Sequence, residues 1–357
     1  MLKPKFIYII GPRFTVDSLA KEHLNYLKHK FELILISEGK RIACDDFLHL
    51  TVDFHRNPSP IQDLSLLFQL VKCIAAHKDA SYIMVSTPKI SFLVSIVSKI
   101  LNKEFIYLHR GAVYQNFTGI RKVIYKKIDK FIIKAAHRTV FISESLHKYV
   151  STELKLEIPH TRKYNSSKGV NIDKFIPQEI SSHGKEFTYG YCGRICKDKG
   201  FDSLINLILS TSLKKGLHIK ILGKIELTHA EKEKFFQSLE YSHVTYHEWV
   251  DDTSKFFQSI DLLFFPSTRE GFGNVAIEAA ASGVPTIAYN LPGISDAVGD
   301  GLSGILMESG EDIVQKAIEL SNEQTLISAL KVSSRNFAVE NFDQKKVIND
   351  LFSFLNL

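Results

Sequence analysis

The chain has 357 residues, of which 45% are hydrophobic and 24% are charged. This length suggests two domains, and this balance excludes disordered, collagen-like and disulfide-stapled chains. The formal net charge of +6 at pH 7 favours an anionic partner: a polyanion, a membrane surface or a phosphorylated small molecule.

Nothing at the start of the chain predicts export or membrane insertion. The apolar run that follows Lys5 stops at Gly11-Pro12, which is too short for a signal-peptide core, and no small-residue cleavage site follows. The longest apolar stretch, residues 90–101, is interrupted by Lys99 and is too short for a spanning helix. The expected location is the cytoplasm, including a peripheral place at the inner face of the plasma membrane.

Short apolar runs alternate with helical patterns in the first half of the chain. The expected strands are residues 6–10, 33–36, 82–85, 105–108 and 139–142. The expected helices are residues 18–28, 61–77, 90–101 and 120–136. This order is typical of βαβ units, so we expect an N-terminal Rossmann-like domain over residues 1–165.

The pattern starts again after residues 159–184, which hold two prolines and two glycines and show little periodicity. Strands are expected at residues 187–192, 218–222, 244–246, 262–265, 286–288 and 304–306, and helices at 201–209, 230–239, 274–281 and 313–320. We therefore expect a second Rossmann-like domain over residues 166–340. Residues 341–357 are expected to form a helix that packs back toward the first domain.

The predicted fold class is α/β, with two doubly wound domains facing a central cleft. Sheets of this kind bind ligands at the carboxyl ends of their strands, and a cleft between two such domains suits a two-substrate reaction. The loops that follow strands are therefore the places to search for chemistry.

The loop within residues 262–284 carries the densest set of candidate residues. An apolar strand ends before Pro266 and a helix begins near Asn274. Gly271 and Gly273 would let a ligand approach the backbone, and the helix N-terminus would point N–H groups at it. Two carboxylates, Glu270 and Glu278, stand eight positions apart.

The same loop also fits the Gly-x-Gly-x-x-Ala dinucleotide pattern, at residues 271–276. In dinucleotide-binding domains these glycines follow the first strand, whereas here they follow a late strand and a loop that carries Arg269 and Glu270. An NAD-dependent oxidoreductase is therefore an alternative of low rank.

Glu270 and Glu278 resemble the Glu-x7-Glu signature of retaining GT-B glycosyltransferases, the family 4 or group 1 class. Gly193-Arg194 and Lys199-Gly200 resemble that family's Gly-Arg-x4-Lys-Gly segment. Further similar segments follow in the usual order, at residues 168–171, 281–285, 292–296 and 300–304. Lys168 stands where the family usually has Asn, at a position that we interpret as structural.

The first domain matches this family less closely. Gly11-Pro12 replaces the Gly-Gly pair that often follows the first strand, and His109 begins a segment similar to the family's His-containing loop. A histidine that follows a strand is as often a structural residue as a functional one.

The resemblance implies a role for each matching residue. Arg194 and Lys199 would stabilise the leaving diphosphate, Glu270 would hold the sugar and Glu278 the ribose. The alternative for such residues is a set of solvated surface charges. The expected catalytic residues are Glu270, Arg194, Lys199 and His109, and the expected donor-binding residues are Gly11, Gly193, Gly271, Phe272, Gly273, Asn274, Val275 and Glu278; Phe272 could instead pack in the domain core.

The implied activity is transfer of a hexose or N-acetylhexosamine from a nucleotide diphosphate sugar, first of all a UDP-sugar, with retention at the anomeric carbon. The acceptor would be a hydroxyl of a glycan or lipid-linked glycan in bacterial surface polysaccharide synthesis, either O-antigen or capsule. We expect no metal, since Asp251-Asp252 is not an Asp-x-Asp motif, and no cofactor. We expect no nucleic-acid partner either, and a non-catalytic nucleotide-sugar binding protein remains the alternative.

Residues 119–138 contain seven basic side chains and one acid, Asp129, so their net charge equals that of the whole chain. Lysines recur every fourth residue along one helical stripe, and we expect Val123, Ile124 and Ile132 among the residues of an apolar face. One interpretation is an ordinary solvated helix face. The other is contact with an anionic membrane through Lys122, Lys126, Lys127 and Lys130.

Overall fold

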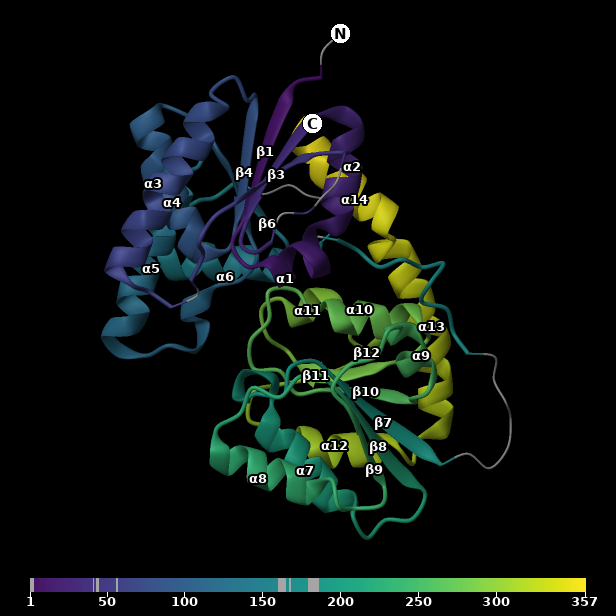
Figure 1. Cartoon of the computed structure of the whole chain (residues 1–357). Helices are drawn as coiled ribbons and strands as arrows, with labels where there is room; N and C mark the ends of the chain where they lie inside the picture. The colour runs from purple at the N-terminus through teal and green to yellow at the C-terminus, as the bar shows by residue number, and fades with distance from the viewer. Residues whose placement is uncertain are drawn as a thin grey trace. The chain divides into compact units, whose positions relative to one another are not determined.

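The computed structural model describes residues 3–40, 42, 45–55, 57–159, 165–166, 168–178 and 186–357 (Figure 1). The chain divides into two compact units. Unit 1 comprises residues 1–162 and 351–357, and unit 2 comprises residues 163–350.

Unit 1 is built on a six-stranded parallel sheet with the order β3-β2-β1-β4-β5-β6. Residues of β1 and β2 are buried on both faces of the sheet, which explains why their sequences are continuous apolar runs. The strands are β1 (Lys5–Ile10), β2 (Glu32–Ser37), β3 (Leu48–Thr51), β4 (Tyr82–Ser86), β5 (Ile106–His109) and β6 (Arg138–Phe141).

Helices cover both faces of this sheet, and α3, α4 and α5 lie side by side on one of them (Figure 1). The helical segments are α1 (Arg13–Thr15), the π-helical turn η1 (Val16–Ala20), α2 (Lys21–Lys30), α3 (Pro60–Ala76), α4 (Pro88–Leu101), the 3-10 turn η2 (Val113–Asn116), α5 (Gly119–Ala135) and α6 (Glu144–Leu154). Because each helix returns the chain between parallel strands, the helix N-termini lie at the carboxyl edge of the sheet.

Unit 2 repeats the architecture, with the parallel order β12-β11-β10-β7-β8-β9. Its strands are β7 (Phe187–Cys192), β8 (Leu217–Leu222), β9 (Val244–His247), β10 (Leu262–Phe265), β11 (Thr286–Tyr289) and β12 (Gly304–Met307). Its helical segments are η3 (Lys197–Lys199), α7 (Phe201–Thr211), α8 (His229–Ser238), α9 (Thr253–Gln258), α10 (Asn274–Ala281), α11 (Ile294–Ala297), α12 (Ile313–Leu320) and α13 (Gln324–Phe342).

The last helix, α14 (Gln344–Phe354), begins in unit 2 and ends in unit 1. In unit 1 the ring of Phe352 stacks on Tyr26 of α2, with ring centroids 4.7 Å apart. A carbonyl of the same helix, that of Phe354, accepts a hydrogen bond from Arg138 Nη1 at 2.6 Å. The C-terminal helix is thus anchored to unit 1 by both packing and a charged donor.

The prediction of two doubly wound α/β units is confirmed. Counted from the start of each unit, both sheets have the strand order 3-2-1-4-5-6, so the direction of winding reverses between the first and the fourth strand. In unit 1 this switch point lies between β1 and β4, and in unit 2 between β7 and β10. Ligands of such sheets bind beside the carboxyl ends of these strands.

The strand β3, the helix α6 and the short helices α1, α9 and α11 have no counterpart among the elements expected from the sequence, and β5 ends one residue later than expected. His109 is therefore the last residue of the strand, paired with Phe141 of β6, rather than the first residue of a loop. None of the helices in the described parts of the chain has the length and apolar character needed to cross a membrane.

Candidate active site

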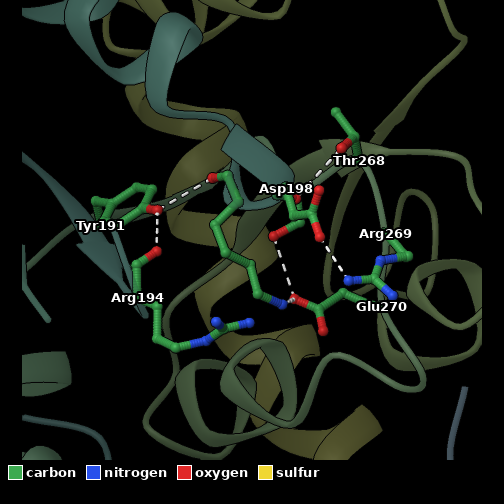
Figure 2. Close-up of polar contacts among 8 residues, drawn as sticks. Tyr191, Arg194, Asp198, Thr268, Arg269 and Glu270 are labelled. Carbon is green, nitrogen blue, oxygen red and sulfur yellow. Dashed lines mark hydrogen bonds and ion pairs between the residues drawn. The ribbon is translucent and has the colours of Figure 1, made fainter. Parts of the chain in front are cut away.

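Two loops meet at the switch point of unit 2, one after β7 and one after β10. The backbone N of Thr268 donates to the carbonyl of Asp198 at 3.0 Å, and Arg269 Nη2 donates to Asp198 Oδ2 at 2.5 Å (Figure 2). Gly200 makes the close approach possible: its φ is +78°, and a Cβ there would stand 2.2 Å from the carbonyl oxygen of Pro266. The sequence motif alone suggested no role for Gly200.

The central contact between the loops is an ion pair. Lys199 Nζ donates to Glu270 Oε1, and Ser267 Oγ donates to the same oxygen at 3.1 Å. The two charged side chains are only 17% and 16% exposed, so water screens their attraction less than it would at the surface. The structure thus brings together two of the expected catalytic residues, 71 positions apart in the sequence.

Arg194 follows β7 as expected, but its charge is directed elsewhere. Its Nη1 donates to Glu226 Oε2 at 2.5 Å, and the side chain is more exposed than that of Lys199. The backbone nearby is held by Tyr191, whose hydroxyl donates to the carbonyls of Arg194 and Lys199 at 2.9 and 3.1 Å (Figure 2). Burial raises the pKa of Tyr191, so the phenol keeps the proton that it donates.

The expected donor-binding residues around α10 differ in how far they are exposed to solvent. Gly271, Asn274 and Val275 are partly exposed around the N-terminus of α10. Phe272 is buried and packs edge-on against Phe342, with ring centroids 5.4 Å apart, so its side chain belongs to the core of unit 2. A ligand could meet Phe272 only through its backbone.

Glu278 lies on α10 and is paired with a residue that the sequence analysis took for a structural one. Lys168 Nζ donates to Glu278 Oε1 at 2.8 Å. Cys192, at the end of β7, is also near: burial raises the pKa of its thiol and the charge of Glu278 adds to the effect. The signal in the sequence was a lysine at the position where the resembled family usually has asparagine.

In unit 1, the side chain of His109 is fully buried, with Nε2 3.0 Å from Asp129 Oδ2 of α5. Among the described residues no hydrogen-bond partner meets its Nδ1. Gly11 follows β1 and is packed so closely that a Cβ there would lie 2.9 Å from the ring of Phe54. Nothing in these contacts tests a role of either residue toward a ligand, and both roles stay predictions.

The basic helix α5 differs from its predicted amphipathic pattern. Lys122 and Lys126 both pair with Glu153 of α6, at 3.2 and 3.3 Å, and Lys130 Nζ donates to the carbonyl of Leu154 at 2.9 Å. Lys127 is exposed. Val123 and Ile124, expected on the buried face, are about half exposed, because the core of unit 1 takes up the face that carries Ile132 and Ile133.

No group of three or more metal-ligating side chains comes together anywhere in the described part of the chain. Cations and carboxylates instead form four pairs around the carboxyl edge of the second sheet: Lys199–Glu270, Arg194–Glu226, Arg269–Asp198 and Lys168–Glu278. Such an edge can exchange a carboxylate for a phosphate without burying an unpaired charge.

Residues 186–323 match the family model described as "Glycosyl transferases group 1". A capsular polysaccharide biosynthesis glycosyltransferase, CapM of Staphylococcus aureus, is 29% identical over 340 residues, which cover 90% of this chain and 89% of that protein. An O-antigen biosynthesis glycosyltransferase, WclY of Escherichia coli, is 20% identical over 341 residues, covering 91% of this chain and 86% of that protein.

Two solved structures share the fold. A sucrose-phosphate synthase of Thermosynechococcus elongatus superposes with a TM-score of 0.79 at 14% identity, over 99% of this chain and 98% of that one. HepE of Anabaena in complex with UDP-glucose has a TM-score of 0.76 at 15% identity, over 99% of each chain. The fold is the GT-B fold. The comparisons support a group 1 glycosyltransferase.

Proposed function

We propose that the chain is a retaining glycosyltransferase that moves a hexose or N-acetylhexosamine from a nucleotide diphosphate sugar, in the first instance a UDP-sugar, to an acceptor hydroxyl. The observation that carries the proposal is the Lys199–Glu270 pair, which joins two loops at the switch point of the unit that matches the family model. The expected signature residues are thus neighbours in space as well as in pattern.

The paired charges suggest how a donor is received. A diphosphate oxygen takes the place of Glu270 on Lys199, and Arg194 can turn from Glu226 to the same diphosphate. The released carboxylate of Glu270 then accepts hydrogen bonds from sugar hydroxyls, which offsets the loss of its ion pair. In this exchange each charged side chain gains a new partner, so no charge stays unpaired.

The reaction itself breaks the bond between the anomeric carbon and the phosphate oxygen and forms a bond from that carbon to the acceptor oxygen on the same face. The proton of the acceptor hydroxyl passes to the departing phosphate oxygen. Lys199 and Arg194 stabilise the negative charge that grows on the diphosphate, as preorganised donors do in other transferases. This scheme assigns no step to a metal or a cofactor.

The acceptor and pathway are proposed from the relatives. CapM is named for capsular polysaccharide and WclY for O-antigen biosynthesis, and HepE was solved with UDP-glucose. We propose that this chain acts in the same type of pathway and extends a glycan or lipid-linked glycan for a bacterial surface polysaccharide.

The test is a thermal-shift panel of nucleotide sugars followed by a turnover assay. A donor that binds the folded state raises the melting temperature by mass action, and we expect UDP-sugars to give the largest shift. Release of UDP from that donor, with and without glycan acceptors, then measures catalysis. A shift with no turnover under any acceptor would favour the non-catalytic binding protein, and no shift with any nucleotide sugar would refute the proposal.

Peripheral contact with an anionic membrane is part of the same proposal, because a lipid-linked acceptor lies at a bilayer. Ile120 is 77% exposed, and with Val123 and Ile124 it forms an apolar surface beside exposed Arg121 and Lys127. Apolar side chains next to cations are the composition of an interfacial helix. The candidate contact residues are therefore these five, because Lys122 and Lys126 pair with Glu153 and Lys130 donates to the carbonyl of Leu154 within unit 1.

Co-sedimentation with vesicles that contain phosphatidylglycerol tests this contact. The double variant Val123→Ser/Ile124→Ser should reduce the bound fraction, since it removes apolar area and leaves the charges. Arg121→Gln/Lys127→Gln should reduce it as well, and more so at low salt. Leu213→Ser, at an almost fully exposed leucine of unit 2, is the control. Equal binding by all variants would contradict the assignment.

A further inference from the structure

Lys168 reaches Glu278 from a segment that precedes the first strand of unit 2. Lys168 Nζ lies 2.8 Å from Glu278 Oε1, and the two side chains are only 21% and 15% exposed. The partners are 110 positions apart in the sequence, so the pair exists only because the segment is laid against α10. Because both side chains are partly buried, water screens their attraction less than it screens an exposed ion pair, which contributes little to stability.

The backbone on both sides of Lys168 is anchored. Ser166 Oγ accepts hydrogen bonds from the backbone N of Lys168 and Gly169 at 3.3 and 3.1 Å, and it donates to Asn274 Oδ1 at 3.1 Å. The backbone N of Val170 donates to the carbonyl of Phe342 at 2.8 Å. The lysine is thus held between the N-terminus of α10 and the end of α13.

Gly169 shows how closely this segment is packed. Its φ is +64°, and a Cβ there would stand 2.7 Å from Cα of Gln344. Only glycine combines that conformation with that approach. The position of Lys168 is therefore set by the backbone on both sides of it, and the side chain has one carboxylate within its reach in the described structure.

Glu278 keeps one oxygen for another partner. Oε1 accepts from Lys168, whereas Oε2 has no hydrogen-bond partner among the residues that the structure describes. A carboxylate with one oxygen held and the other open can accept hydrogen bonds from the two neighbouring hydroxyls of a ribose. If the carboxylate lost its counter-charge, it would be less favourably buried and free to take other rotamers.

We infer that Lys168 is a positioning residue for the nucleotide: it holds the carboxylate of Glu278 in the orientation that receives the ribose hydroxyls, and so sets the preference for ribose over deoxyribose. This inference rests on the proposed function, in which Glu278 binds the ribose of the donor. It assigns to Lys168 a role in specificity and none in bond breaking.

The experiment compares affinities for a ribonucleoside diphosphate and its 2′-deoxy form by calorimetry, with UDP and dUDP as the first pair. Hydrogen bonds to a charged group are strong enough that the unaltered protein should prefer UDP on the order of tenfold or more. Lys168→Met should bring that ratio down to the value of Glu278→Gln. Lys168→Arg, which keeps the cation, should retain most of it.

Lys174→Met is the matched control, because Lys174 lies in the same segment and pairs with the distant, more exposed Asp252. The double variant Lys168→Met/Glu278→Gln should have the same ratio as either single variant, since both act through one carboxylate. If Lys168 were merely structural, its substitution would lower the melting temperature and weaken the binding of UDP and dUDP equally. Lys168→Gln replaces Lys168→Met if the latter does not fold.

The outcomes separate the inference from the proposed function. An unaltered ratio in Lys168→Met or Lys168→Gln overturns the inference, and so does an unaltered protein that binds both nucleotides equally. If the unaltered protein binds no nucleoside diphosphate at all, in a panel extended to GDP and ADP, then the proposed function fails first.

Discussion

The two units have the same strand order but different chemistry at their switch points. In unit 2 the loops after β7 and β10 are joined by Lys199–Glu270, by Arg269–Asp198 and by a backbone hydrogen bond. In unit 1 no ion pair within the described residues joins the loops after β1 and β4. Gly11 there is packed against the ring of Phe54 instead.

The difference shows that one topology can carry different sets of side chains at its switch point. Reversal of winding opens the edge of both sheets between the first and fourth strands. In unit 2 that edge carries the pairs that Lys199, Arg194 and Lys168 form with carboxylates. In unit 1 the described cations that follow β1 and β4, Arg13 and Lys89, pair with Asp17 and Asp63. Unit 1 carries its excess positive charge on the helix α5.

Removal of one cation from the edge of unit 2 should have the largest effect on turnover. Lys199→Ala should lower kcat by about 100- to 1,000-fold, as the loss of a preorganised donor does elsewhere. Lys197→Ala is the control: it lies two residues away in the same turn, but its side chain is 73% exposed and pairs with Glu231. Equal effects of the two substitutions on kcat in a steady-state assay would contradict the proposed catalytic role of Lys199.

A second variant tests whether the close approach of the two loops matters. Gly200 and Gly216 have nearly the same φ, +78° and +79°, but a Cβ at Gly216 would meet nothing within 4 Å. Gly216→Ala should therefore cost about 1–2 kcal/mol of unfolding free energy for the left-handed backbone alone. Gly200→Ala should cost about 1–3 kcal/mol more, because the loops must separate.

Urea unfolding of both glycine variants measures this difference, and donor affinity provides a second readout. We expect weaker donor binding in Gly200→Ala only, since Lys199 and Glu270 would move apart. If both variants lost the same stability, the contact between Gly200 and Pro266 would not be tight in solution.

His109 is the catalytic candidate of unit 1, and its substitution should have the smallest of these effects. His109→Phe should lower the unfolding free energy by about 1–3 kcal/mol, because the buried Asp129 loses a hydrogen-bond partner. Thermal melting measures that loss. Turnover at a temperature well below the transition decides the role: an unchanged kcat would refute the catalytic assignment, whereas a fall in kcat of the folded protein would support it.

Much of the fold could be predicted because strands such as β1, β2, β5 and β10 are apolar runs buried on both faces. The omitted strand β3 is four residues long, and only one of them, His49, is fully buried, so it lacks that signal. The omitted helix α6 had a local signal, since Ser143 caps it by accepting a hydrogen bond from the backbone N of Leu146 at 3.1 Å. The exposed apolar residues of α5 could not be foreseen, because a helical pattern does not tell which face meets the core.

The sequence by itself determined which residues follow the strands of unit 2, and with them the spacing of Glu270 and Glu278 on either side of the start of α10. It did not determine which cation meets which carboxylate. Lys199 reaches Glu270, Arg194 reaches Glu226, and Lys168 reaches Glu278 across 71, 32 and 110 positions. Only the tertiary structure decided these pairs. Strands that are distant in the chain become neighbours in the sheet and bring the loops of Lys199 and Arg194 to their partners, whereas Lys168 meets Glu278 because its segment packs against α10.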